Sequence, residues 1–435
     1  MSDPLHLVVD WTRFDGWFHL YVGEWDVPRG PLGVLAYLPF VPLFWITPPR
    51  FARAFLIGTS LFVWYVTLGP AYLGLLTGLL AYYYAATWPA TRTGGTETAP
   101  TRRLILTVGL VHLPYIWLLF DPTPFFLPSL GESINVRTNY LHWCGLAYMH
   151  LKAVVVVVDR LQGRLRPIAL GDWLAYMLFA PTFKMGPLYR YDHFVAQLQD
   201  AHRNVQVPRG LLRIGVGLLR LGVMVFFLQK QIRPGLFAEP QGMAYYKLLI
   251  SAALKPLELY FWLAGYCDIV IGIGRLMGFR VPEQFRGPWF VSDIADFWQR
   301  WSITLGKWLY DYPFRAMVAC RVPRWLCFIL TFLYCGLWHG AFWSYVLWGL
   351  SQGAGLAVYH AWHRWWSRRK KRNGSVVRHL RRWRIADGPV GWSLAWVVLV
   401  AYQFLTIAVA SDLEYAGSRM VPALLGLPPA VSFAG

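Results

Sequence analysis

The chain has 435 residues, of which 56% are apolar and 14% are charged, and 24 are Trp. A soluble domain holds about 25% charged residues, so this composition excludes an ordinary soluble protein. The formal net charge of +19 does not indicate nucleic-acid binding, because most of the excess is local. The five cysteines form neither a CxxC motif nor a metal-ligand spacing, so no metal site is expected.

Long apolar runs dominate the chain. A helix of about 20 apolar residues spans a bilayer, and several of the runs are long enough for two spans. The pattern predicts an all-α, polytopic membrane protein with about 9–11 transmembrane helices plus re-entrant or interfacial helices. The runs cover residues 31–47, 53–90, 104–120, 140–158, 211–228, 244–277, 325–362 and 391–410.

The first part of the chain divides into two predicted regions. Residues 1–30 lack the basic start of a signal peptide and carry acids and aromatics instead, which predicts an interfacial segment. Residues 31–134 are predicted to form the N-terminal transmembrane helices. In the following run, His142 and His150 are not spaced at the three- or four-residue step of a helical metal pair. They are interpreted as cavity-lining or packing residues, with acceptor binding as the alternative.

A charged and aromatic segment, DFWQRWSITLGKWLYDYPF, occupies residues 296–314. Asp296 precedes Arg300 by four positions, the favourable order for an ion pair on a helix. The segment is predicted to be an amphipathic helix that lies at the interface, or dips into the membrane with its polar face along a cavity. Its charged face also holds Lys307 and Asp311, and its apolar face is formed by Phe297, Trp298, Trp301, Leu305, Trp308, Leu309 and Tyr312.

The string GLWHG, residues 336–340, lies between two apolar spans. An ionisable group inside a membrane is a functional candidate, and histidine suits acid–base work near neutral pH. Gly336 and Gly340 would allow a second chain segment or a ligand to approach the backbone closely. From the residues alone, His339 is either a hydrogen-bonded structural histidine or a catalytic base.

Residues 364–384 form the most basic stretch, with ten Lys or Arg and no acid. A short basic loop between apolar spans stays in the cytoplasm, so this loop is predicted to be cytoplasmic. It is expected to set the topology and contact anionic lipid, with a phosphate-rich ligand such as coenzyme A as the alternative.

Three motifs in this order resemble the membrane-bound O-acyltransferase (MBOAT) family. FWQRWSITLGKWLYDY at 297–312 and LWHG at 337–340 are similar to FWRRWHxSLSxWLRDY and LWHG of its bacterial branch, which includes alginate O-acetyltransferases and the D-alanine transferase of teichoic acids. PTFKMGPLYRYDHF at 181–194 is similar to the family's GP-x-x-R-Y stretch. The similarity covers residues 135–425, which are predicted to be an MBOAT-like catalytic membrane core that contains the basic loop.

The chain departs from the family pattern at two motif positions. Ser302 stands where bacterial relatives have His and many eukaryotic relatives have Asn, and Tyr310 replaces an Arg. A serine hydroxyl donates and accepts hydrogen bonds but is not a base by itself. A mechanism with two motif histidines is therefore excluded, and His339 is the only histidine at a family catalytic position.

The resemblance implies a helical funnel in which a thioester donor enters from the cytoplasm and meets an acceptor hydroxyl within the membrane. His339 is then the catalytic base, and Ser302 orients the acceptor or donates to the carbonyl. Cationic residues are expected on the donor phosphates or an acidic acceptor. The expected substrate-binding residues are Arg190, Arg300, Lys307, Asp311, His142, Trp298, Trp301 and Trp338.

The resulting functional prediction is an O-acyltransferase of the inner membrane. It moves a short acyl group, such as acetyl, from acyl-CoA or an acyl carrier protein to a hydroxyl of a cell-surface polysaccharide. No tightly bound cofactor is expected; the expected partners are membrane lipids, donor, acceptor and proteins that export the acyl group, and nucleic acid is not among them. The alternatives are a lipid, small-molecule or secreted-peptide acceptor and, in another class, a transporter or flippase without chemistry.

Overall fold

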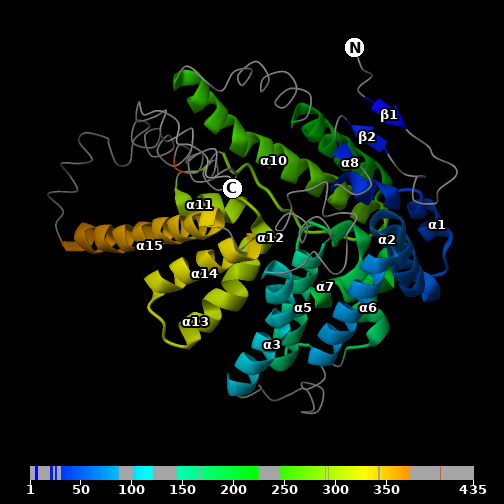
Figure 1. Cartoon of the computed structure of the whole chain (residues 1–435), viewed down its shortest axis with the longest axis horizontal. Coiled ribbons are helices and arrows are strands. Elements are labelled where there is room, and N and C mark those ends of the chain that lie inside the picture. Colours follow the sequence, from blue (N-terminus) through cyan, green and yellow to red (C-terminus); the bar gives the residue numbers. More distant parts are fainter. Residues whose placement is uncertain are drawn as a thin grey trace, which may run out of the picture. The chain divides into compact units, whose positions relative to one another are not determined.

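The computed structural model of the protein describes residues 5–7, 20–22, 25–26, 31–87, 101–120, 145–165, 168–224, 245–289, 291, 293–340, 343–372 and 402. These residues are predominantly helical, as the apolar runs predict (Figure 1). The chain divides into two compact units. Unit 1 comprises Met1–Leu218 and Tyr266–Glu283, and unit 2 comprises Leu219–Gly265 and Gln284–Gly435.

A small antiparallel sheet near the N-terminus is the exception to the all-α prediction. Strands β1 (Leu5–Leu7), β2 (Leu20–Val22) and β3 (Trp25–Asp26) pair in chain order. Tyr21, Val22 and Trp25 are of types that favour a pleated strand, and a count of apolar runs does not detect strands this short. All three strands lie within residues 1–30, whose interfacial location stays a prediction.

After the sheet, unit 1 continues with short helical segments, and longer helices follow. The apolar run 53–90 is long enough for two spans, but α2 is one helix of 36 residues with Pro70 inside it. The elements are η1 (Pro31–Tyr37), α1 (Phe40–Ile46), η2 (Pro49–Phe51), α2 (Ala52–Thr87), α3 (Thr101–Phe120), α5 (Leu146–Leu161), α6 (Leu170–Leu178), η4 (Ala180–Thr182), α7 (Tyr191–Asp200), η5 (Ala201–Asn204) and α8 (Val207–Gly222), whose last residues belong to unit 2.

Helix α5 is the most buried helix of unit 1 and packs against α2, α3 and α6 (Figure 1). All of its 16 residues are buried, including the charged Lys152 and Arg160. Lys152 Nζ donates to the carbonyl of Tyr176 at 3.2 Å and to Thr182 Oγ1 at 3.0 Å. Arg160 Nη1 donates to the carbonyl of Leu165 at 2.7 Å. Charged side chains can be buried where protein groups satisfy their hydrogen bonds, and both of these α5 side chains donate to protein oxygens.

Helix α10 (Tyr245–Leu276) runs from unit 2 into unit 1. Among the described residues, its stretch Pro256–Leu276 is the one helical segment both long and apolar enough to cross a membrane, by length and composition. Shorter apolar helical stretches occupy Val34–Ile46 and Thr107–Ile116. The prediction of about 9–11 spans rests on the lengths of the apolar runs. Some of these runs hold polar residues, which lower their mean hydropathy. That number stays a prediction.

Unit 2 is built around a long antiparallel helix pair, α14 and α15, which lie side by side (Figure 1). Glycines make this close approach possible. A Cβ added at Gly336 would meet the carbonyl oxygen of Tyr345, and one added at Gly349 would meet that of Phe332. The helices of this region are α11 (Ile294–Arg300), α12 (Ile303–Leu309), the π-helical turn η7 (Tyr310–Phe314), α13 (Arg315–Ala319), α14 (Arg324–His339) and α15 (Trp343–Arg372).

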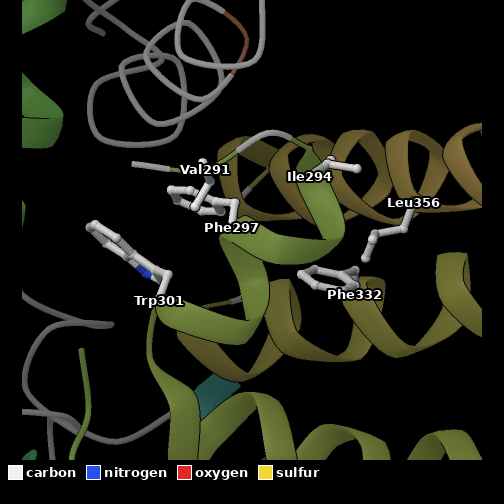
Figure 2. Close-up of a cluster of buried hydrophobic side chains, with 6 residues drawn as sticks. All are labelled: Val291, Ile294, Phe297, Trp301, Phe332 and Leu356. Atoms are coloured by element: carbon white, nitrogen blue, oxygen red, sulfur yellow. The ribbon is translucent and has the colours of Figure 1, made fainter. Parts of the chain in front are cut away.

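An apolar cluster joins α11 to this helix pair (Figure 2). Phe332 comes from α14 and Leu356 from α15, while the remaining members come from α11 and the residues beside it. Trp301, at the end of α11, stacks on Phe297 with ring centroids 5.5 Å apart. The cluster therefore fixes the first half of the motif segment against α14 and α15. Its members are Val291, Ile294, Phe297, Trp301, Phe332 and Leu356.

The basic stretch 364–384 is predicted to be a loop, and its first part is not. Helix α15 continues to Arg372, so nine of these residues, 364–372, are helical. Lysine and arginine are good helix formers, and the stretch holds no glycine or proline before residue 374. The rest of the stretch lies outside the described residues.

Candidate active site

The motif segment 296–314 does not form the single amphipathic helix that its pattern predicts. Helix α11 ends at Arg300, and α12 begins at Ile303. Between them, Ser302 has a left-handed backbone with φ 47° and ψ 52°. That conformation costs a residue with a side chain about 1–2 kcal/mol. The prediction of one helix is wrong because side-chain periodicity cannot reveal a break that a distant residue imposes.

Gln284, in the loop that precedes α11, holds the break in place. Its carbonyl accepts a hydrogen bond from the backbone N–H of Ile303 at 2.9 Å. Its side-chain Oε1 accepts from the backbone N–H of Thr304 at 3.2 Å and from the Thr304 hydroxyl. Its Nε2 donates to Ser302 Oγ at 3.0 Å. Together, the hydrogen bonds of this one buried residue fix the backbone and hydroxyl of Ser302.

The two faces predicted for the segment are confirmed despite the break. Six of the seven side chains of the predicted apolar face are buried, while Lys307 of the predicted charged face is exposed. Trp298, between the two faces, is half-buried. The predicted division into faces holds because each half keeps its own helical period. The buried members are Phe297, Trp301, Leu305, Trp308, Leu309 and Tyr312.

His339 is the last residue of α14, where the chain turns toward α15, as the sequence predicts. Its ring is half-buried among aromatic side chains. The centroid of the imidazole lies 4.7 Å from the ring centroid of the buried Trp338, 5.7 Å from that of Tyr345 and 5.5 Å from that of Trp348. Tyr345 stacks on the imidazole, and Trp348 meets it at an interplanar angle of 80°. The imidazole therefore lies in an aromatic setting at the end of a helix.

Trp348 connects His339 to the other motif. The Trp348 ring lies 6.0 Å from that of Trp298 on α11, again nearly perpendicular. Trp298 Nε1 also donates to Gln352 Oε1, one turn further along α15, at 3.2 Å. Sequence segments that lie far apart, α11 and the end of α14, thus contact the same helix, α15. Through the Trp348 ring, the structure connects Trp298 to His339.

Two of the charged candidates of the segment, Arg300 and Asp311, form ion pairs within the protein. Arg300 Nε lies 2.8 Å from Asp296 Oδ1, which confirms the predicted ion pair. Asp311 Oδ1 lies 4.0 Å from Arg315 Nη1, the next turn of helix. Lys307 is exposed on α12. Arg300 and Lys307 are the predicted ligands of the donor phosphates or an acidic acceptor, and the role of Arg300, Lys307 and Asp311 as substrate ligands stays a prediction.

Arg190, from the GP-x-x-R-Y stretch, belongs to unit 1 and carries two ion pairs. Its Nη2 lies 3.2 Å from Oδ2 of Asp159, which is 1% exposed, and its Nε lies 3.2 Å from Asp192 Oδ1. Arg164 Nη1 binds the other oxygen of Asp159 at 3.0 Å. Burial alone would raise the pKa of Asp192, but the hydrogen bond and charge of Arg190 outweigh it, so the pKa lies below its usual value. Arg190 thus ties the start of α7 to α5.

One predicted site residue lies outside the described part of the chain, and other residues of the site could not be predicted from the sequence. His142 lies outside the described residues, so its role stays a prediction. No sequence pattern points to Gln284 or Trp348 as site residues, whereas Gln352, a glutamine within the apolar run 325–362, is a usable signal of a buried polar contact. Within the part of the chain that the structure describes, no three His, Cys, Asp or Glu side chains gather in a way that could hold a metal ion.

Comparison with known proteins identifies the family to which the chain belongs. A family model described as MBOAT, membrane-bound O-acyltransferase family, matches residues 61–386, which include all three motifs. The chain belongs to the membrane-bound O-acyltransferase family. Members are integral membrane enzymes, so this MBOAT protein is a polytopic membrane protein and an O-acyltransferase.

Several bacterial proteins are similar to this chain. The chain is 26% identical over 410 residues to a peptidoglycan O-acetyltransferase of Helicobacter pylori, covering 84% of this chain and 75% of that one. It is 29% identical over 346 residues to a probable alginate O-acetylase of Azotobacter vinelandii, covering 75% and 67%. It is 28% identical over 259 residues to a teichoic acid D-alanyltransferase of Streptococcus thermophilus, covering 55% and 62%. These relatives place this MBOAT protein in the bacterial branch that its motifs resemble.

Proposed function

We propose that the protein transfers a short acyl group, such as acetyl, from an acyl thioester to a hydroxyl of a cell-surface polysaccharide. Family membership supports the reaction class. Similarity to proteins named for O-acetylation of peptidoglycan and alginate supports a polysaccharide acceptor and an acetyl group. The donor is acyl-CoA or an acyl carrier protein, and further proteins pass the acyl group onward where the polymer lies outside the cell.

The chemistry assigned to the site is direct acyl transfer. The neutral imidazole of His339 removes the proton of the acceptor hydroxyl while the oxygen attacks the thioester carbonyl carbon. A C–O bond forms, and the carbonyl electron pair moves onto oxygen, where a hydrogen-bond donor stabilises it. When that pair returns, the C–S bond breaks, and the thiolate takes the proton from the imidazolium. The products are an ester and a free thiol.

The observation that carries the proposal is the setting of His339. An imidazole that lies half-buried at a helix end, against the rings of Trp338, Tyr345 and Trp348, supports a role as the base. Trp298 of the FWQRW motif reaches the same Trp348 ring, which supports one site built from both motifs. Arg300 and Lys307 of the same segment are proposed for the donor phosphates or an acidic acceptor. The predicted role of Arg190, which belongs to unit 1, stays a prediction.

The membrane arrangement is part of the proposal. We infer a funnel of about 9–11 spanning helices, following the length rule for apolar runs. The donor enters from the cytoplasmic side, and the basic stretch 364–384 faces the cytoplasm because its positive charge resists translocation. Its lysines and arginines contact anionic lipid headgroups there.

The test compares cells that lack the gene, complemented with wild type or with His339→Gln at equal protein levels. Mass spectrometry of ester-linked acyl groups is run separately on the polysaccharide, lipid, small-molecule and secreted-peptide fractions. We expect acetyl esters on the polysaccharide fraction with wild type and their loss with His339→Gln. Esters confined to another fraction would reassign the acceptor, and identical fractions in all strains would contradict an acyltransferase function.

A further inference from the structure

We propose that Gln284 is a positioning residue that turns the Ser302 hydroxyl proton toward the substrate. The inference deepens the proposed function and rests on it. Gln284 is far from either catalytic motif position in the sequence, and its side chain is 3% exposed. A buried amide keeps its place only when both of its ends are hydrogen-bonded, and here the bonds define what Ser302 can do.

The orientation of the Gln284 amide follows from its partners. The backbone N–H of Thr304, 3.2 Å away, can only donate, so the atom that faces it must be the carbonyl oxygen Oε1. The other end, which faces Ser302 Oγ at 3.0 Å, must then be the NH₂ group. The amide nitrogen has donors and no acceptor, so Ser302 accepts this hydrogen bond and cannot return one. The hydroxyl proton of Ser302 points elsewhere.

Because of Gln284, Ser302 does not make the capping hydrogen bond that is usual at its position. Ser302 is the N-cap residue of α12, where a serine hydroxyl normally accepts from a backbone N–H in the first turn. Ser302 makes no such bond, because the side chain of Gln284 accepts from Thr304 instead. The helix is therefore capped from a loop eighteen positions earlier in the chain, and the Ser302 hydroxyl is available for another partner.

Backbone contacts make the arrangement rigid. The carbonyl of Gln284 accepts from Ile303 N–H at 2.9 Å, and the N–H of Arg286 donates to the carbonyl of Arg300 at 3.0 Å. The loop thus pairs with the chain on both sides of Ser302, whose left-handed backbone it imposes. A half-buried hydroxyl held in this way acts as a hydrogen-bond donor, and the group it fits is the thioester carbonyl oxygen as it becomes an oxyanion.

The central variant is Gln284→Glu, which keeps the acceptor for Thr304 but replaces the donor toward Ser302 with a second acceptor. The Ser302 proton would then bind the carboxylate and be lost to the substrate. We expect the turnover number to fall about tenfold, to the level of Ser302→Ala, because one neutral hydrogen bond is lost in each. The KM for the donor should stay unchanged, while the melting temperature should fall because a carboxylate replaces a buried neutral amide. A Gln284→Glu, Ser302→Ala double variant should be no slower than Ser302→Ala.

The pH dependence gives a readout that a purely structural role would not move. In the Gln284→Glu protein, the introduced carboxylate takes up a proton as the pH falls, and its O–H can then donate to Ser302 as the amide does. The transfer rate of Gln284→Glu relative to wild type should therefore rise as the pH falls. A constant ratio across the pH range, or turnover equal to wild type at neutral pH, would overturn the positioning role.

A second pair of variants tests the donor role without changing Gln284. Ser302→Gly suits the left-handed backbone but has no hydroxyl, whereas Ser302→Asn tolerates that backbone and carries an amide that both accepts and donates. We expect the glycine variant to lose about tenfold in turnover and the asparagine variant to keep most of it. Equal loss in both would contradict the inference. If wild type transfers no acyl group, or His339→Ala transfers at the wild-type rate, the proposed function fails instead.

Discussion

The two units place ionisable groups in opposite ways. In unit 1, α5 buries Asp159, and the guanidiniums of Arg164 and Arg190 bind both of its oxygens. In unit 2, the helix that should continue through the FWQRW motif breaks at Ser302, and His339 ends a helix half-buried among aromatic rings. A charge whose bonds are all made within the protein holds the fold together. A hydroxyl and an imidazole at helix ends can instead meet a substrate.

If this comparison is right, removal of the His339 imidazole has the largest effect on transfer and little effect on the fold. We expect His339→Ala to slow acyl transfer by about 100- to 10,000-fold, the usual contribution of a general base. The melting temperature of the purified protein should stay near that of wild type, because the substitution removes only a half-buried side chain at the end of a helix. The control is His193→Gln on an exposed position of α7. Transfer near the wild-type rate by His339→Ala would remove the catalytic role of unit 2.

The opposite result is expected for Asp159→Asn in unit 1. Removing one partner of a fully buried ion pair costs about 3–5 kcal/mol, and the loss here should be smaller because both arginines are partly exposed. We expect a lower free energy of unfolding in detergent and an unchanged KM for the donor. Asp192→Asn, at the exposed partner of Arg190, should change stability by less than about 1 kcal/mol. A raised donor KM with unchanged stability would show that Arg190 binds substrate.

A third variant connects packing to the site. Gly336→Ala forces a methyl group against the carbonyl of Tyr345, so α14 and α15 must separate. We expect a loss of about 1–3 kcal/mol in the free energy of unfolding, and slower transfer because Tyr345 shifts against His339. Gly58→Ala in α2 is the matched control, since a Cβ there meets nothing within 4 Å. That variant should gain about 0.5–1 kcal/mol from helix propensity. Equal effects of the two substitutions would contradict the packing argument.

The smallest effect is expected at the partly exposed ion pair of unit 2. Asp296→Asn removes the partner of Arg300 on α11. Such a helical pair contributes about 0.3–0.5 kcal/mol, so thermal unfolding should barely change. Donor binding gives the sharper measurement, because Arg300 without its acid can turn toward a phosphate. A large loss of stability would show that unit 2 also depends on paired charges for its fold.

Part of the site could be predicted from the sequence because it depends on neighbours along the chain. The Asp296–Arg300 pair follows from a four-residue step, and the two faces of the motif segment follow from helical periodicity. The position of His339 at a helix end follows from the apolar runs on either side. The contact of Gln284 with Ser302 could not be predicted, because no local pattern links a loop residue to a serine eighteen positions later.

The sequence by itself determined the membrane class, the helical secondary structure and the motif residues of the family, since apolar runs and short motifs are local properties. Only the tertiary structure decided that α11 and α12 separate at Ser302, that Trp348 links Trp298 to His339, and that Arg190 binds Asp159. Each of these contacts joins residues from different elements. Their formation depends on how helices pack, and helix packing is set by the summed burial of many side chains rather than by any one segment.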